Sequence, residues 1–294
     1  MRLTLRQLQV FVAIAQTGST AAAGHSLGLS QSASSAALKE LEAHWDCPLF
    51  DRIGRGLQLN ARGRRLLPQA RALLVDAARL EQAMAAPAGG WDLRLAASST
   101  IGNHLLPAPI ASLLANYPLS RIDLQIGNTA QVARAVAQGS VDAGLIEGPC
   151  PLPQLRMQPW RQDRLLVVAS PRLATDTVAQ LQAARWLLRE PGSGTRQVFD
   201  EQLLPCLGGS LDHVQLGSTA AIVAAAMAGA GVACLSEWAL ADALSSGQLR
   251  QVAAPLPALA RTLWLLELPG RGRNPALDAL LGPLDASPSA MDLR

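Results

Sequence analysis

Residues 19–42 read STAAAGHSLGLSQSASSAALKELE and predict two short helices joined by a tight turn. The first helix, roughly Thr20–Leu27, is mostly alanine, which is the strongest helix former. Gly28 can adopt the positive φ that ends a helix. Ser30 then occupies the N-cap position of a second helix, Gln31 to about Ala43. The stretch is therefore typical of a helix-turn-helix.

The second of these helices has two faces. The spacing i, i+3, i+4, i+7 and i+11 of a buried stripe is met by Ser34, Ala37, Leu38, Leu41 and Trp45. Another side carries Gln31, Ser32, Ser35 and Lys39. Glutamine can bond an adenine edge, and serine can bond bases or phosphates, so this side suits a helix in the major groove. Such patterns are short, and this stretch alone fits a solvated face on an ordinary helix pair about as well.

The flanking segments favour the DNA-binding interpretation. Upstream, a further helix with one apolar stripe is predicted from Leu5, Leu8, Phe11, Val12 and Ala15. Downstream, residues 47–67 read CPLFDRIGRGLQLNARGRRLL, and their Pro, Gly and Arg residues predict a short hairpin or wing. Arg52 and Arg55 on this wing would be free to meet phosphate.

Residues 5–67 resemble the N-terminal domain of LysR-type transcriptional regulators. The matching pieces are LRQLQVFVAIAQTGS, AAGHSLGLSQSASSAALKELE and PLFDR…LQLNARG, in the order and at the spacing of that family. The resemblance implies an all-α winged helix-turn-helix domain at residues 1–60 that binds double-stranded promoter DNA. The contacts would come from Gln31, Ser32, Ser35, Lys39, Arg52 and Arg55.

The chain departs from the family pattern at four positions, one of which is Asn60, an N-cap residue where the family has threonine. Thr20 stands where the family usually has an aromatic residue, and Ala21 where it has threonine. Ser34 stands where it has an aliphatic residue. A serine there would place a hydroxyl on the packed face, so we expect the domain to be less stable than usual.

Residues 61–87 predict a linker helix with a dimerisation seam. Asn60 would cap it, and Pro68 would bend it near its start. A heptad seam is formed by Leu66, Ala70, Leu73, Ala77, Leu80 and Met84. The seam exceeds what a small headpiece can cover, which favours pairing with a second copy over packing within one chain. The resemblance implies a homodimer through this helix and, beyond it, a homotetramer.

Length, charge distribution and cysteine content limit the kinds of protein that this chain can be. The chain has 294 residues, which suits two or three domains. Ten basic and six acidic residues lie within the first 90, so the basic excess falls on the segment predicted to touch DNA. No long apolar run and no clean signal peptide is present, which predicts a cytoplasmic protein.

The scattered cysteines predict reduced thiols, with a redox-sensing pair as the alternative; they are Cys47, Cys150, Cys206 and Cys234.

Residues 88–294 predict an α/β domain after a breaker cluster at 87–90. Short aliphatic runs alternate with helical stretches, which favours mostly parallel sheets. The strands are expected at Leu93–Ala97, Arg121–Ile126, Ala143–Ile146, Leu165–Ala169, Trp186–Leu188, Val214–Leu216, Val232–Leu235 and Thr262–Leu268. The segment resembles the LysR-type effector-binding domain, with two lobes like periplasmic binding proteins. Lobe I would be about 91–160 with 266–294, and lobe II about 161–265.

Four polar stretches follow predicted strands, where ligands bind in such folds. The expected ligand-binding residues are Ser98, Ser99, Thr100, Asn128, Thr129, Ser193, Gly194, Thr195, Ser218 and Thr219. Any one of them could be a simple helix cap, but four stretches in a two-lobed fold favour a shared anion pocket. REPGSGTR at 189–196 resembles the carbon-fixation and sulfur-metabolism branch of the family. That implies a small anionic effector, an inorganic oxyanion or a phosphorylated metabolite.

Catalysis has little support in the sequence. The isolated histidines sit in no catalytic or metal-binding motif; they are His25, His44, His104 and His213. We therefore expect a regulator, not an enzyme, with no cofactor and no metal. The alternative is a solute-binding protein or small-molecule enzyme whose N-terminal helices serve only for dimerisation.

Overall fold

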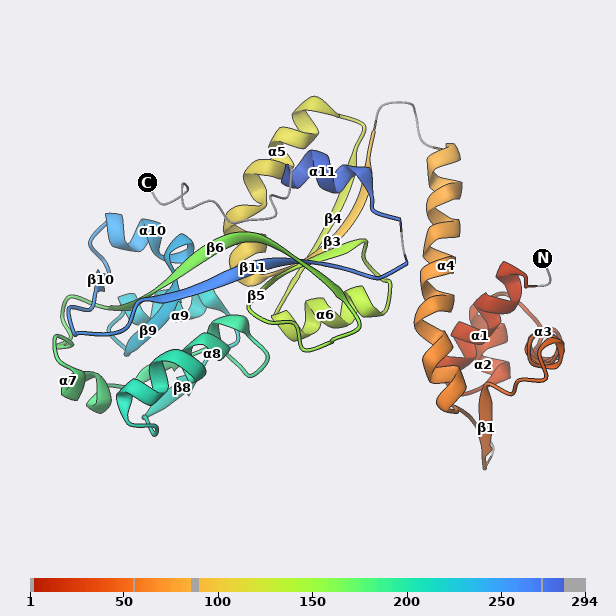
Figure 1. The fold of residues 1–294 in the computed structure, drawn as a ribbon, viewed down its shortest axis with the longest axis horizontal. Coiled ribbons are helices and arrows are strands. Elements are labelled where there is room, and N and C mark those ends of the chain that lie inside the picture. Colours follow the sequence, from red (N-terminus) through yellow and green to blue (C-terminus); the bar gives the residue numbers. More distant parts are fainter. Residues whose placement is uncertain (1–2, 55, 86–89, 271, 283–294) are drawn as a thin grey trace. The chain divides into compact units, whose positions relative to one another are not determined.

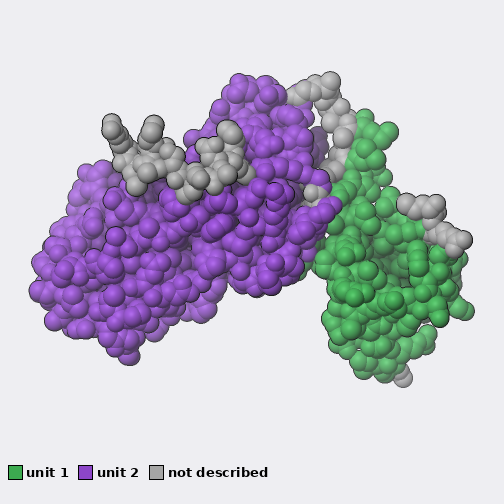
Figure 2. Space-filling view, viewed as in Figure 1, with its two compact units in different colours: residues 1–88, 138–140 green, residues 89–137, 141–294 purple. Residues whose placement is uncertain are grey.

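The computed structural model describes residues 3–54, 56–85, 90–270 and 272–282 (Figure 1). The chain divides into two compact units, coloured separately in Figure 2. Unit 1 comprises residues 1–88 with 138–140, and unit 2 comprises 89–137 with 141–294. No helix in the described residues is both long and apolar enough to cross a membrane. The predicted breaker at 87–90 lies largely outside the described residues.

Unit 1 is a set of helices with one two-stranded hairpin. Its elements are α1 (Leu5–Thr17), α2 (Thr20–Ser26), α3 (Gln31–His44), β1 (Phe50–Ile53), β2 (Gly56–Leu59) and α4 (Ala61–Ala85). β1 and β2 pair antiparallel and form the predicted wing. The Ser30 hydroxyl accepts a hydrogen bond from the Ala33 amide, which caps α3 as the sequence indicates. Pro68 lies inside α4, which continues on both sides of it.

The core of unit 1 is aliphatic around one aromatic pair. Phe11 of α1 and Phe50 of β1 meet edge to face, with ring centroids 5.6 Å apart. Leu38 and Leu41 of α3 are buried beside them, as the predicted stripe requires. Trp45 was wrongly predicted to continue this stripe, because it is 53% exposed. The helix ends at His44, so the next side chain no longer follows the helical rotation.

Helices α2 and α3 approach each other at Gly24 and Ser34. A Cβ atom on Gly24 would lie 2.9 Å from both the Ser34 Oγ and the Leu29 carbonyl oxygen. Ser34 is fully buried, and its hydroxyl has no hydrogen-bond partner in the part of the chain that the structure describes. The predicted hydroxyl on the packed face is therefore present. A buried, unpaired hydroxyl costs stability because it has lost its hydration.

Unit 2 contains one twisted sheet with helices packed on it. Its lobe I elements are β3 (Asp92–Ser98), η1 (Ile101–Leu105), α5 (Pro107–Asn116), β4 (Arg121–Gly127), α6 (Thr129–Ala137), β5 (Ala143–Glu147) and α11 (Pro275–Leu281). The long strands β6 (Arg156–Ala169) and β11 (Leu259–Glu267) run between the lobes. The lobe II elements are α7 (Val178–Ala183), β7 (Trp186–Leu188), α8 (Gly194–Val198), η2 (Phe199–Leu203), η3 (Leu204–Leu207), β8 (His213–Gln215), α9 (Thr219–Met227), β9 (Val232–Ser236), α10 (Glu237–Ser245) and β10 (Arg250–Gln251).

The sheet is parallel in each lobe and antiparallel at its centre. The strand order is β4-β3-β5-β11-β6-β9-β7-β8, with β10 beside β6. β3 is parallel to β4 and β5, and β7 is parallel to β8 and β9. β11 is antiparallel to both β5 and β6, and β6 to β9. The predicted parallel arrangement therefore holds within the lobes but not for the two strands that join them.

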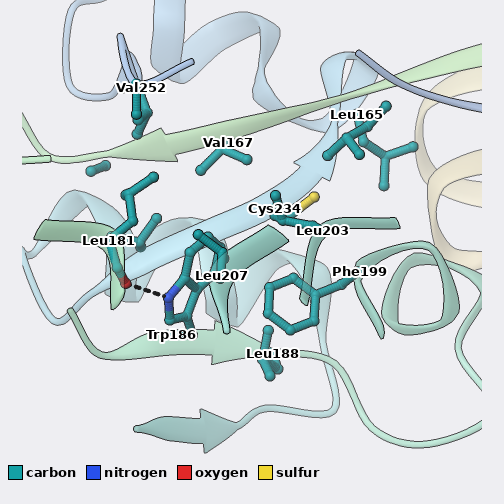
Figure 3. Packing of buried hydrophobic residues seen from close by; sticks show 14 of the residues in the cluster. Leu165, Val167, Leu181, Trp186, Leu188, Phe199, Leu203, Leu207, Cys234 and Val252 are labelled. Atoms are coloured by element: carbon teal, nitrogen blue, oxygen red, sulfur yellow. Dashed lines mark hydrogen bonds between the residues drawn. The ribbon is translucent and has the colours of Figure 1, made fainter. Parts of the chain in front are cut away.

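Each lobe has its own apolar core. In lobe II, Trp186 is fully buried beside Phe199, and its indole N–H donates to the Leu181 carbonyl oxygen at 2.9 Å (Figure 3). That bond satisfies the only polar atom of the side chain. In lobe I, Leu93, Leu145 and Leu265 from three neighbouring strands are completely buried. Separate cores leave the lobe junction to be held by other contacts.

We expect Ser34→Ala to stabilise unit 1. The substitution removes an unpaired buried hydroxyl and keeps the Cβ atom, so it should raise the free energy of unfolding by about 1 kcal/mol. Ser35→Ala is the matched control, because Ser35 is exposed on the same helix and should leave stability unchanged. Urea unfolding of the full-length chain measures both variants. A loss of stability in Ser34→Ala would show that the hydroxyl makes a bond in solution.

Candidate functional site

The predicted DNA-contacting side chains lie on the exposed side of α3 and on the wing. Gln31, Ser32, Ser35 and Lys39 are all exposed on α3, whose buried residues are Ser34, Leu38 and Leu41. The Ser32 hydroxyl lies 2.9 Å from the Ser30 hydroxyl. Arg52 is exposed on β1, and Arg55 lies outside the described residues. Their contacts with DNA remain predictions.

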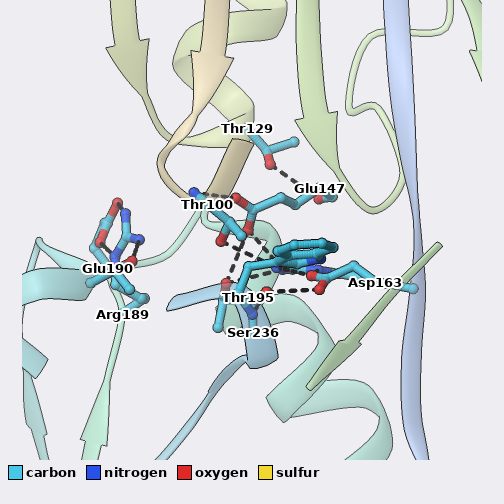
Figure 4. A network of polar contacts seen from close by, with 11 residues as sticks. Thr100, Thr129, Glu147, Asp163, Arg189, Glu190, Thr195 and Ser236 are labelled. Atoms are coloured by element: carbon cyan, nitrogen blue, oxygen red, sulfur yellow. Dashed lines mark hydrogen bonds and ion pairs between the residues drawn. The ribbon is translucent and has the colours of Figure 1, made fainter. Parts of the chain in front are cut away.

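In unit 2, polar side chains from both lobes converge on Glu147, at the end of β5 (Figure 4). The Thr100 amide donates to its Oε1 at 2.9 Å, and the Thr195 hydroxyl to its Oε2 at 3.0 Å. The Thr129 hydroxyl donates to the Glu147 carbonyl oxygen at 3.1 Å. Thr100 and Thr129 belong to lobe I and Thr195 to lobe II. One carboxylate thus joins residues of both lobes.

Arg261 of β11 completes this cluster with two ion pairs. Its Nη1 lies 2.7 Å from Glu147 Oε2, and its Nη2 lies 2.6 Å from Asp163 Oδ2. All three side chains are at most 2% exposed. The guanidinium also donates to the Thr195 hydroxyl at 3.0 Å. The Ser236 hydroxyl of lobe II donates to Asp163 Oδ1 at 2.7 Å, so every charge in the cluster is paired.

In this cluster two carboxyl groups share one guanidinium. Burial opposes ionisation of Glu147, but Arg261, the Ser98 hydroxyl and the Thr100 amide outweigh it and hold the pKa of Glu147 below its usual value. Burial raises the pKa of Asp163, more than Arg261 and Ser236 lower it. Burial also disfavours the charged guanidinium, yet the two carboxylates raise the pKa of Arg261. The site therefore holds a buried cation between two carboxyl groups, of which Glu147 is the more readily ionised.

Further contacts hold the two lobes against each other. The side-chain amide of Asn128 donates to Glu190 Oε1 at 3.1 Å. The backbone amide of Ala130 donates to the Gly192 carbonyl oxygen at 3.2 Å. Within lobe II, Arg189 forms an ion pair with Glu190 and donates to the Thr219 hydroxyl at 2.8 Å, which positions Glu190 for its contact with lobe I. The contact between Gly194 of lobe II and the backbone of Glu147 in lobe I requires glycine. A Cβ atom on Gly194 would lie only 1.8 Å from the Glu147 carbonyl oxygen, so no larger residue fits there without movement.

An open cavity of about 460 Å³ lies beside the cluster. Thr129 and Ala130 line it from lobe I, and Ser193 and Arg196 from lobe II. Ser193 is 4% exposed, and its hydroxyl does not cap the helix that follows. A small ligand in this cavity would reach polar groups of both lobes.

The structure brings together most of the predicted ligand-binding residues. Thr100, Thr129, Gly194 and Thr195 contact Glu147. Ser98 is buried, and its hydroxyl helps to hold the pKa of Glu147 below its usual value. Of the rest, Ser193 lines the cavity, Asn128 spans the lobes, and Thr219 binds Arg189. Ser99 and Ser218 lie outside this set of contacts, and Ser218 is an exposed cap of α9.

Sequence reasoning missed the charged centre of the site. Glu147 directly follows the predicted strand Ala143–Ile146, which is the same signal that identified Ser98 and Asn128. Asp163 and Arg261 give a weaker signal, as single charged residues beside aliphatic runs. Among the described residues, no group of His, Cys, Asp or Glu side chains has the arrangement of a metal site, and the four cysteines are free thiols.

Two family models match the chain and together cover both units. Residues 5–64 match the bacterial regulatory helix-turn-helix protein family, lysR type. Residues 90–286 match the LysR substrate binding domain. The chain is 46% identical over 268 residues to the HTH-type transcriptional regulator YeiE of Escherichia coli, covering 90% of this chain and 91% of that one.

More distant relatives agree with this result. The HTH-type transcriptional regulator CbbR of Rhodospirillum rubrum is 30% identical over 289 residues, with 96% of each chain covered. The fold also resembles that of full-length CbnR in complex with its target DNA, at a TM-score of 0.60 and 21% identity. That match covers 95% of this chain and 97% of CbnR. The protein belongs to the LysR family of helix-turn-helix transcriptional regulators.

Proposed function

We propose that this regulator binds promoter DNA as a homodimer or homotetramer in the cytoplasm and responds to a small anion at the lobe junction of unit 2. One observation supports the anion above all. Donors from both lobes, including a backbone amide, a hydroxyl and a guanidinium, converge on a single carboxylate, Glu147. A set of donors that satisfies one buried carboxylate is chemically suited to a small oxyanion.

The effector would act by changing how the lobes meet. Lobe I and lobe II share the contacts around Glu147 and the Asn128–Glu190 hydrogen bond. A ligand that binds these groups favours one lobe arrangement, and it shifts the population by its difference in affinity between arrangements. The cavity lined by Thr129 and Ser193 offers the entry path. The absence of aromatic side chains from its lining is consistent with a small polar effector.

Dimerisation is proposed through α4. Of the heptad seam, Ala70 is buried in unit 1 itself, whereas Leu73, Leu80 and Met84 are 49%, 64% and 81% exposed. An apolar groove of about 440 Å³ adjoins Leu73 and is also lined by Phe11 and other side chains of unit 1. Exposed apolar side chains at heptad spacing are suited to burial against α4 of a second copy. A dimer would present two recognition helices to a pseudo-palindromic site.

The first of three predictions from the proposed function concerns DNA reading by α3. Gln31→Ala and Ser35→Ala should weaken binding to an operator selected by the wild-type protein by about 1–3 kcal/mol and change random-duplex binding little. Arg52→Ala should instead weaken both duplexes alike and reduce the salt dependence, because it contacts phosphate. Fluorescence anisotropy at several salt concentrations measures both effects. Equal losses on operator and random DNA for Gln31→Ala would remove that residue from base reading.

The second prediction concerns the oligomer. Replacing Leu73 and Leu80 together by Arg should abolish the dimer, because charged side chains cannot be buried in an apolar seam without partners. Glu81→Arg, beside the seam, is the matched control and should remain dimeric. Size-exclusion chromatography with light scattering measures the mass. A dimer of unchanged mass in the double variant would place the interface elsewhere.

The third prediction concerns the effector. Thermal unfolding of the full-length protein is measured with sulfite, sulfate, thiosulfate, phosphate, sugar phosphates and simple carboxylates at millimolar concentration. A ligand at about 100 times its Kd should add roughly 2.7 kcal/mol of stability. Thr195→Ala removes a hydroxyl donor and should remove the response. Thr100→Ala keeps the backbone amide but removes a hydroxyl that accepts from Arg261 at 3.4 Å, so it should weaken the response. Thr177→Ala, which loses a cap in lobe II outside the cluster, should keep it. If no anion stabilises the protein, the effector is not of this class.

A further inference from the structure

The Glu147 carboxylate occupies the place where an oxyanion would bind. Its two oxygen atoms accept from the Thr100 amide, the Thr195 hydroxyl and the Arg261 guanidinium, at 2.7–3.0 Å. Guanidinium, hydroxyl and backbone amide are the groups that proteins use to hold carboxylates and other oxyanions. Every one of these donors is already committed to a side chain of the protein itself.

We propose that Arg261 is the residue that binds the effector anion, and that Glu147 is an internal counter-anion that holds this guanidinium until the effector displaces it. The inference rests on the proposed function, because it assumes an anionic effector at the lobe junction. It adds a binding residue, a displaced group and a class of ligand.

The charge of the cluster identifies that class. Arg261 faces two buried carboxylates, from Glu147 on β5 and Asp163 on β6. If a singly charged anion replaces Glu147 and the displaced carboxylate takes up a proton, the charge of the site does not change. A doubly charged anion would add one buried negative charge, which is costly in a site that excludes water. The site therefore favours a small, singly charged oxyanion.

Displacement would also change the lobe contact. The Thr195 hydroxyl of lobe II reaches Glu147 of lobe I, and Gly194 packs on the carbonyl oxygen of the same residue. Movement of the Glu147 side chain breaks its contact with Thr195. The packing of Gly194 on the Glu147 carbonyl oxygen remains, because it involves only the backbone of Glu147. The incoming anion can bond Thr100 and Thr195 in its place. Binding is thereby coupled to the arrangement of the lobes.

Proton uptake gives the inference a measurable signature. A displaced Glu147 loses Arg261 and remains in a buried place, so its protonated form becomes favoured. The other titratable groups near the cluster are Asp163, Cys234 on β9 and His104 in η1. Burial raises the pKa of Cys234 to about 12 and lowers the pKa of His104, so both stay neutral from about pH 6.5 to about pH 8.5. Only the two carboxylates remain as proton acceptors.

The test compares full-length wild-type protein with Glu147→Gln. Formate and nitrate are the probes, because both stay singly charged across this pH range, and sulfate is the doubly charged comparison. In wild type, affinity from thermal-shift titrations should fall as pH rises, by up to about tenfold for each unit, because the displaced carboxylate takes up a proton on binding. Glu147→Gln should bind formate or nitrate at least tenfold more tightly and without this pH dependence. It should also gain affinity for sulfate.

Controls separate Glu147 from general charge effects. Glu237→Gln removes one negative charge from an exposed ion pair with Arg164 and should behave like wild type. Arg261→Met should bind no probe. If Glu147→Gln does not fold, Glu147→Asp shortens the carboxylate by one methylene and should show an intermediate gain. A pH dependence that persists in Glu147→Gln would assign the proton to Asp163 and overturn the inference, as would an unchanged affinity.

Hydrogen exchange separates failure of this inference from failure of the proposed function. The Thr100 amide donates to Glu147, so its exchange should accelerate at least tenfold in Glu147→Ala, which removes the acceptor oxygen, even without ligand. If no probe binds any variant but this acceleration is seen, the anionic effector is wrong and Glu147 still holds the site. If anions bind wild type with no dependence on Glu147, the proposed function stands and displacement is wrong.

Discussion

A buried guanidinium between two carboxylates is the constraint on which the arrangement of unit 2 depends. Removing such charges from water costs several kcal/mol for each ion, and only close pairing offsets that cost. The sheet order provides the pairing, because β11 lies between β5 and β6. Arg261 and Asp163 are direct partners in the antiparallel register, and Glu147 is opposite Leu263 on the other side of β11. A slip of either strand by one residue would separate the charges.

This constraint explains why hydroxyls gather at the junction. Two carboxylates have more lone pairs than one guanidinium can satisfy, and the remaining acceptors need other donors. Thr195 and Ser236 of lobe II and the Thr100 amide of lobe I supply them. Replacing a buried ion cluster by apolar residues is often neutral or stabilising, so its value is more one of specificity than of stability. Here it specifies which surfaces of the two lobes meet.

The sequence predicted what local patterns encode. The Ser30 cap, the buried positions of α3 and the strands of both lobes follow from neighbours a few residues away. It did not predict the cluster, because Arg261 and Asp163 are 98 residues apart and meet only through the strand order. The first half of β6 was missed for a related reason. That segment is largely polar and half-exposed, and it becomes a strand by pairing with β11.

Because the site already contains its own carboxylate, an effector must bind tightly enough to displace that group. Glu147 competes from within the molecule, where an attached group acts at a high effective concentration. A ligand that only reproduces its contacts with Arg261, Thr100 and Thr195 would bind weakly at metabolite levels. An effector must make additional contacts, and Ser193 beside the cavity is placed to offer one. The internal carboxylate would thus favour a small oxyanion that bonds further hydroxyls over one that only reproduces the carboxylate contacts.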